Sequence, residues 1–188
     1  VGEDARMISV FHMGDTQHYA GNSLEALISA IQMGADVVEV DLCKTADGHI
    51  VLMHDATLSK YTDFATKNGV NGLPTDDDLT KWTLEQLRQL RLINGKSGYV
   101  ITTLEEVLSV SNGRVKLLLD KIFDSNFNPV LDWDTDIYPI IEKTGAWDTC
   151  ILPYQYNVNT QIAIADKLKD GAGDNSLNTH AFLKFTGD

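Results

Sequence analysis

The chain has 188 residues, of which 43% are hydrophobic and 22% charged, as in an ordinary globular domain with a sizeable core. Its formal net charge of −12 argues against nucleic acid and anionic membrane surfaces as main partners. No apolar run reaches the roughly 18 residues that a spanning helix needs, so stable membrane insertion is not expected. The oligomeric state stays unknown.

Cys43 and Cys150 are the only cysteines, and each lies in a strand-like stretch. Two buried free thiols are therefore predicted rather than a disulfide, and two cysteines alone cannot make a zinc site. The chain begins at Val1 without a charged and then apolar leader pattern, which indicates a processed or trimmed chain. The compartment stays uncertain, with an extracellular or periplasmic location slightly favoured over a cytoplasmic one.

Strand-like and helix-like segments alternate from the start of the chain, which is typical of βα units. A first strand is predicted over residues 7–11. Asn22-Ser23-Leu24-Glu25 then has the pattern of a capping box, with Asn22 as the N-cap of a helix that runs to Met33.

Two strands joined by a tight turn are predicted over residues 37–55. Asp47-Gly48 is a strong signal for a two-residue turn, which would pair Asp41 directly with His54. A longer loop would shift the pairing by one residue and keep the two as neighbours. Glu39 and Asp41 are two residues apart on a strand, so both carboxylates point to one face. Two carboxylates and an imidazole are thus expected in one small volume.

This cluster has two interpretations. A Glu-x-Asp pair on a strand most often lies on the solvated face of a half-buried sheet. However, the flanking residues form near-continuous apolar runs, which is typical of strands covered on both faces. Carboxylates in such strands need a cation or several hydrogen bonds to stay ionised. A metal-assisted acid/base site is therefore the sharper hypothesis.

The remainder of the chain continues the alternation after a polar interruption. Residues 56–98 are rich in Gly and Asp and are predicted to be an insertion within one domain of residues 1–188. Capping boxes predict helices that begin at Thr83 and Thr103. Further elements are expected as a strand over 115–119, a helix over 136–143, a strand over 149–152, a helix over 159–169 and a last strand over 181–185.

These segments give five or six strands, whereas a closed (β/α)8 barrel has eight. A compact barrel variant and a chain that stops before closure both remain open. In either case polar residues stand at the ends of successive strands, where barrel enzymes place their active sites. Carboxylate oxygens suit Mg²⁺ or Ca²⁺ better than zinc, and two histidines beside such a cation suit proton transfer to and from oxygen. These residues are His12, Glu39, Asp41, His54, Asp120 and Lys121.

From His12 to about Gly145 the chain resembles the glycerophosphodiester phosphodiesterase family, one of the phospholipase-C-like barrels. The motifs that carry the resemblance are His12-x-Gly14, Asn22-Ser23-Leu24-Glu25-Ala26, Gly34 to Asp41, Thr45-x-Asp47-Gly48, Met53-His54-Asp55, Thr103 to Leu108 and Asp120-Lys121. The resemblance implies an α/β fold, a distorted TIM-type barrel with a small insertion after His54. It also implies metal-dependent hydrolysis of glycerophosphodiesters to glycerol 3-phosphate and an alcohol.

The resemblance also implies a role for each site residue. His12 and His54 would be the acid/base pair, and Lys121 would lie near the phosphate of a small phosphodiester substrate. One divalent cation, Mg²⁺ or Ca²⁺, would be held by Glu39, Asp41 and Asp120.

The chain departs from the family pattern at several positions. Met13 stands where members usually have a phosphate-binding Arg, Gly21 where they usually have Glu, and Pro153 where a basic residue is common. The third acidic ligand is commonly Glu with Lys two residues later, whereas here Lys121 directly follows Asp120. Two alternatives follow, a degenerate barrel that binds a ligand or partner without turnover, and a phosphodiesterase for another lipid or sugar phosphodiester.

Overall fold

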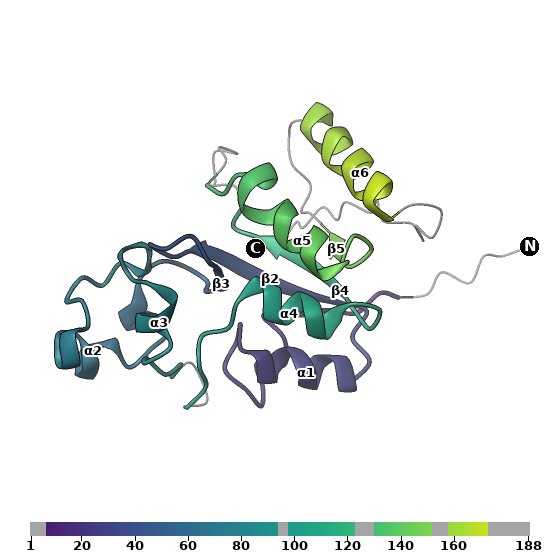
Figure 1. The fold of residues 1–188 in the computed structure, drawn as a ribbon. Coiled ribbons are helices and arrows are strands. Elements are labelled where there is room, and N and C mark those ends of the chain that lie inside the picture. Colours follow the sequence, from purple (N-terminus) through teal and green to yellow (C-terminus); the bar gives the residue numbers. More distant parts are fainter. Residues whose placement is uncertain (1–6, 94–97, 123–129, 152–157, 173–188) are drawn as a thin grey trace, which may run out of the picture.

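The computed structural model describes residues 7–93, 98–122, 130–151 and 158–172 (Figure 1). Within these residues one sheet has the strand order β1-β2-β4-β5, and β3 pairs with the end of β2. Strands β1, β2, β4 and β5 are parallel to one another, while β3 is antiparallel to β2. The strands are β1 Val10–His12, β2 Val37–Lys44, β3 Ile50–Leu52, β4 Lys116–Asp120 and β5 Cys150–Ile151.

The sheet stays open over the described residues, so the predicted α/β fold is present as a distorted, unclosed barrel. Figure 1 shows α2 and α3 set apart from α1, α4 and α5. The part of the chain that the structure describes contains no helix long and apolar enough to cross a membrane. The helices are α1 Leu24–Gln32, α2 Phe64–Lys67, α3 Leu84–Leu87, α4 Leu104–Ser111, α5 Tyr138–Thr144 and α6 Val158–Ala172, with a π-helical turn η4 over Trp133–Ile137 and short 3₁₀ turns η1 Leu58–Lys60, η2 Val70–Gly72 and η3 Leu79–Lys81.

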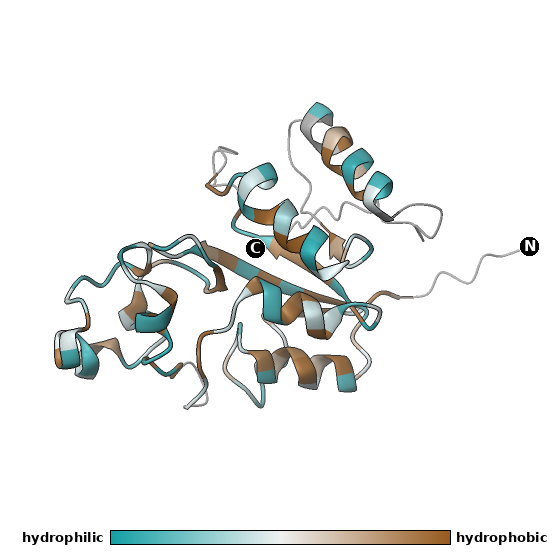
Figure 2. Cartoon of the chain, in the orientation of Figure 1, coloured by the Kyte–Doolittle hydropathy of each residue, from teal (hydrophilic) through white to brown (hydrophobic). Residues whose placement is uncertain are grey.

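Alternation along β2 divides its side chains between two faces of the sheet. Val38 and Val40 join the main core, which also contains buried residues of α1, α4 and α5. Val37 instead joins a smaller cluster with Leu118 and Ile151 on the other face. The period of two therefore places Glu39 and Asp41 on this second face. Figure 2 shows that hydrophobic residues make up much of β2 on either side of these two carboxylates.

The segment predicted as an insertion packs around a hydrophobic cluster of its own. Leu58, Leu79, Trp82 and Leu87 are fully buried there, and β3 adds Val51. Because β3 belongs to this cluster and pairs with β2, the segment is tied to the carboxyl end of the strand that carries the two carboxylates.

The first predicted helix forms, but its N-cap is Ser23 rather than Asn22. Ser23 has the extended backbone of a cap, and its hydroxyl accepts a hydrogen bond from the Ala26 amide at 3.1 Å. Asn22 has a φ of +59°, in the left-handed region, so it cannot take this role. The caps predicted at Thr83 and Thr103 are confirmed.

The hairpin has the longer of the two loops considered. Leu42 pairs with Leu52 and Cys43 with Val51, so the direct pairing of Asp41 with His54 is wrong by one residue. The amide of Thr45 donates to the carbonyl of His49, and Gly48 has a φ of +86°, as a three-residue loop requires. The last predicted strand, over 181–185, lies outside the described residues.

Candidate active site

Three carboxylates meet at the carboxyl end of the parallel sheet. Asp41 of β2 and Asp120, the last residue of β4, are direct partners across the two strands. Glu39 lies two residues before Asp41, and one oxygen from each of the three groups lies within 4.8 Å of the others. The prediction that these residues converge is confirmed in its geometry.

The cluster is buried and its negative charge is poorly offset. Glu39 is 5% exposed and Asp41 1%, and Oε1 of Glu39 has no hydrogen-bond partner among the described residues. Burial, with the neighbouring charges of Asp41 and Asp120, raises the pKa of Glu39 to about 8. Burial also raises the pKa of Asp41. Hard oxygen donors this close, with one oxygen unpartnered, fit a divalent cation such as Mg²⁺ or Ca²⁺.

Asn22 holds Asp41 in place, a role that the sequence did not reveal. Its amide nitrogen donates to Oδ2 of Asp41 at 2.9 Å, and its Oδ1 accepts from the Asp41 backbone amide at 3.1 Å. Asn tolerates positive φ better than most residues, and Ser23 is free to act as the helix cap. The sequence did contain one signal for this role: Asn22 and Ser23 are adjacent and both can cap a helix, so one of them was available for another task.

His12 borders the cluster from β1. It is the strand partner of Glu39, and its Nε2 lies 3.4 Å from Oε2 of Glu39. Its side chain is 70% exposed. The imidazole can therefore reach a substrate that approaches from solvent while it stays beside the carboxylates.

His54 borders the cluster from the hairpin's return arm. Its Nδ1 lies 3.0 Å from the hydroxyl of Tyr61, and its charge acts on Asp41. The Tyr61 contact leaves Nε2 as the ring atom that can exchange a proton with a substrate. Tyr61 was not identified from the sequence, because it lies in the segment that showed no regular pattern.

Lys121 follows Asp120 in a left-handed backbone conformation, with a φ of +67°. Its amide donates to Oδ1 of Asp120 at 2.7 Å. Met13 and Asn22 also have positive φ, so three of the four such non-glycine residues described lie at this end of the sheet. Strained backbone of this kind is typical of functional sites.

Two departures from the family pattern, Met13 and Gly21, lie side by side. A Cβ built on Gly21 would lie 3.1 Å from both Cβ and Sδ of Met13. The Met13 side chain thus occupies space that a side chain at position 21 would need. The backbone of Met13 still serves the site, because its amide donates to the carbonyl of Glu39 at 2.9 Å and to Oε2 of Glu39 at 3.2 Å.

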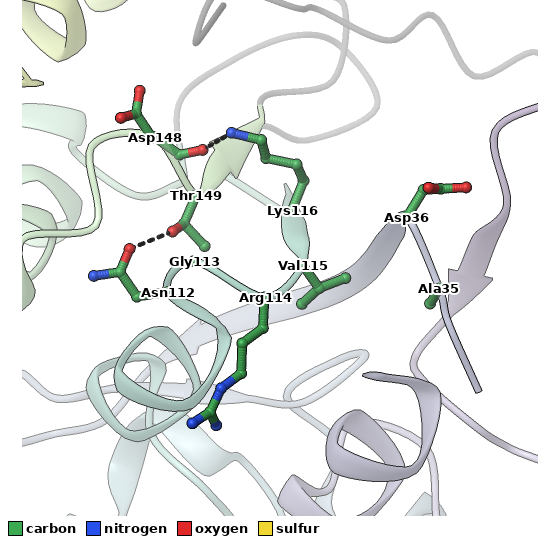
Figure 3. Close-up of a pocket in the computed structure, with 9 residues that line it drawn as sticks. All are labelled: Ala35, Asp36, Asn112, Gly113, Arg114, Val115, Lys116, Asp148 and Thr149. Atoms are coloured by element: carbon green, nitrogen blue, oxygen red, sulfur yellow. Dashed lines mark hydrogen bonds between the residues drawn. The ribbon is translucent and has the colours of Figure 1, made fainter. Parts of the chain in front are cut away.

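A cavity of about 600 Å³ opens beside His54 and Lys121. A second cavity, of about 420 Å³, lies at the opposite, amino end of the strands (Figure 3). Its polar side chains largely bond to the protein: Lys116 donates to the Asp148 carbonyl, and Thr149 donates to Asn112 at 3.0 Å. None of the predicted site residues lines this second cavity. Pro153 lies outside the described residues.

Known proteins are similar to this chain in sequence and in fold. The model of the glycerophosphoryl diester phosphodiesterase family matches residues 12–151. A glycerophosphodiester phosphodiesterase of Caldanaerobacter subterraneus is 33% identical over 85 residues, or 45% of this chain and 30% of that protein. Glycerophosphodiester phosphodiesterase 1 of Bos taurus is 34% identical over 110 residues, which are 55% of this chain and 30% of the relative. The chain thus spans about a third of these relatives.

Solved structures show the same fold at low sequence identity. A glycerophosphoryl diester phosphodiesterase from Parabacteroides distasonis has a TM-score of 0.67 and 21% identity, covering 90% of this chain and 54% of that one. A glycerophosphodiester phosphodiesterase from Agrobacterium tumefaciens has a TM-score of 0.62 and 18% identity, covering 86% and 64% respectively. The family match covers well over half of the sequence, and the chain belongs to the glycerophosphoryl diester phosphodiesterase family.

Proposed function

We propose that this chain forms the metal-binding and acid/base part of a phosphodiesterase that cleaves glycerophosphodiesters to glycerol 3-phosphate and an alcohol. The observation that carries the proposal is the convergence of Glu39, Asp41 and Asp120 beside His12 and His54. A solved phosphodiesterase from Oleispira antarctica, of the same fold with a TM-score of 0.61, holds sn-glycerol 3-phosphate as its product. That product is consistent with the substrate class proposed here.

In this proposal one divalent cation, Mg²⁺ or Ca²⁺, is held by Glu39, Asp41 and Asp120. When bound, such a cation polarises a phosphoryl oxygen and offsets negative charge. Asn22 contributes by fixing the orientation of Asp41 through two hydrogen bonds. The unpartnered Oε1 of Glu39 supports the assignment, because a buried carboxylate oxygen without a hydrogen bond is costly unless a ligand completes it.

The two histidines move protons during the reaction. One takes the proton of the substrate's neighbouring glycerol hydroxyl as that oxygen attacks phosphorus, and the other gives a proton to the alcohol that leaves. Water then opens the cyclic phosphate, and the histidines exchange roles to give glycerol 3-phosphate. Lys121 lies close enough to Asp41 to act on it electrostatically, so its ammonium can offset charge on the phosphoryl oxygens.

The direct test is hydrolysis of glycerophosphocholine and of bis(p-nitrophenyl) phosphate by the purified chain, with Mg²⁺, with Ca²⁺ and with EDTA. We expect glycerol 3-phosphate from the first substrate only when a metal is present, and loss of turnover in Asp41→Asn. Equal rates in metal and in EDTA, or equal rates for wild type and Asp41→Asn, would refute the proposal.

One observation favours a second candidate, a barrel that binds a ligand without turnover. Met13 and Gly21 lie side by side where the family pattern has a charged pair of residue types. The same assay separates the two functions. Formation of a hydrolysis product would refute the hypothesis of a non-catalytic barrel. Metal binding without hydrolysis of either substrate would support it.

A further inference from the structure

The cavity beside His54 and Lys121 is lined mainly by apolar groups. Leu42 and Leu131 form part of its wall, are 2% and 3% exposed, and belong to the main core. Val130 is 63% exposed and lies at the same cavity. One exposed and two buried apolar side chains thus share this wall, which an apolar ligand can cover.

The polar groups of the cavity have partners elsewhere. Lys44 donates to Asp136 at 2.8 Å, and Asp55 accepts from Lys60 at 3.1 Å. Cys43 adds a thiol to the wall, and its sulfur donates a hydrogen bond to the Met53 carbonyl at 3.7 Å. Within the described part of the wall, His54 and Lys121 are the remaining charged or titratable groups.

A quaternary ammonium headgroup would find little here to bind it. Such cations are recognised by aromatic side chains, and among the described residues that line this cavity none is Phe, Tyr or Trp. The carboxylate of Asp55 is already occupied by Lys60 and by the amide of Thr57 at 2.8 Å. The chemistry of the wall favours a hydrocarbon group over a cationic one.

From this arrangement we infer that the cavity binds the leaving alcohol of the substrate, and that this alcohol carries an alkyl chain. The inference rests on the proposed function, because it needs the phosphate to lie between the carboxylate cluster and Lys121. The phosphodiester would then point its alkyl group along Leu42 and Leu131. His54, which lines the cavity, would be the histidine that protonates the leaving oxygen.

Chain-length dependence is the clearest test. Methyl, butyl and octyl diesters of glycerol 3-phosphate, and glycerophosphocholine, are compared in kcat/KM below their micelle concentrations. Each fully buried methylene adds about a four-fold gain in affinity, so we expect the octyl diester to exceed the methyl diester by about 10-fold or more. A flat profile, or a higher kcat/KM for glycerophosphocholine than for the octyl diester, would overturn the inference.

Two variants locate the effect. Val130→Asn adds a neutral polar group at the cavity and should reduce the ratio of the octyl to the methyl kcat/KM several-fold. Val70→Asn is the matched control, since Val70 is also exposed, at 48%, but lies in η2 and does not line the cavity. Equal effects of the two variants on the octyl preference would contradict the assignment.

A binding measurement keeps the inference separate from the proposed function. Octyl phosphate and methyl phosphate are titrated into the chain by calorimetry, with Mg²⁺ present. Tighter binding of octyl phosphate, weakened by Val130→Asn, supports the cavity assignment even if no diester is hydrolysed. Equal affinities overturn it. Hydrolysis of every diester at one rate would overturn only the alkyl specificity, whereas no hydrolysis at all would count against the proposed function.

Discussion

The carboxyl and amino ends of the parallel sheet both carry charged side chains, but these side chains differ in how far protein hydrogen bonds offset their charge. At the amino end Asp36 accepts from the amide and the hydroxyl of Ser9 at 2.9 and 3.1 Å. Lys116 and Thr149 also bond to nearby protein groups, although Oδ1 of Asp148 has no partner among the described residues (Figure 3). At the carboxyl end three carboxylates crowd together and raise the pKa of Glu39.

The backbone repeats this contrast. Turns at the amino end place glycine at positive φ, with Gly34 at +82° and Gly113 at +74°. At the carboxyl end Met13, Asn22 and Lys121 take positive φ despite their side chains. A side chain kept in this conformation costs free energy, which indicates that the side chain or its direction is needed. This contrast is what we expect of a sheet with one end built for stability and the other, as we propose, for binding at some cost in stability.

The largest expected effect is the loss of a histidine at the carboxyl end. His54→Ala should lower kcat by about 10²–10⁴-fold, because general acid/base catalysis contributes about that much. The melting temperature should change little, since the His54 side chain is about a third exposed, at 35%. Steady-state kinetics with the methyl diester measure this. A wild-type rate in His54→Ala would show that this end of the sheet does not supply the acid or base.

Tyr61→Phe sharpens that prediction. It removes the 3.0 Å contact with Nδ1 of His54 while it keeps the aromatic ring. We expect a loss of kcat of about ten-fold, corresponding to a single hydrogen bond, with KM unchanged. A shift in the pH profile of kcat would distinguish the positioning of His54 from a merely structural role.

Met13→Arg should lower KM by about ten-fold or more, because charge-assisted hydrogen bonds contribute about 1.5–3 kcal/mol each. The effect should also depend on position 21, because the Met13 side chain lies where a side chain at that position would be. Gly21→Glu alone should destabilise the fold by crowding Met13, and should be better tolerated with Met13→Arg, where the two charges can pair. A double-mutant cycle of KM and of unfolding free energy measures this coupling. Strict additivity would contradict it.

Glu39→Gln should stabilise the metal-free protein while abolishing metal binding. The folded-state pKa of Glu39 is raised from 4.5 to about 8, so the folded state binds more protons than the unfolded state between these values. The free energy of unfolding of the metal-free wild type should therefore fall as pH rises from about 4.5 through 8, and this fall should be smaller in the variant. Denaturant unfolding at several pH values, in EDTA and in Ca²⁺, provides the measurement. An unchanged pH slope in Glu39→Gln would contradict the account.

The smallest effect is expected at the amino end. Asn112→Ala removes the acceptor of the buried Thr149 hydroxyl, which should cost about 1 kcal/mol of stability. The kcat and the metal affinity should be unchanged. Thermal unfolding and kinetics on the same preparation test both halves of this prediction. A loss of activity would contradict the view that the amino end contributes to stability alone.

The sequence predicted the carboxylate cluster because it depends on strand periodicity and on the polar residue that ends a second strand. Two residues apart on β2, Glu39 and Asp41 share a face, and Asp120 ends the neighbouring parallel strand. The hairpin register was less certain, because Asp47-Gly48 fits both a two-residue and a three-residue loop, and only hydrogen bonding selects between them.

The supporting residues were harder to predict. Asn22 was assigned to capping because the same side-chain chemistry suits a helix cap and a carboxylate partner, and its φ decides between them. Tyr61 reaches His54 from a segment without hydrophobic periodicity. The contact of Met13 with Gly21 depends on how the chain returns after β1, which no local pattern encodes.

Anomalous diffraction from crystals of the chain soaked in Mn²⁺ tests the central claim most directly, because it locates the ion without reference to turnover. The account predicts one strong peak among Glu39, Asp41 and Asp120, at about 2.0–2.6 Å from their oxygens, and no such peak in Glu39→Gln. A peak beside Asp36 or Asp148 at the amino end, or no ordered ion at the three carboxylates, would contradict it.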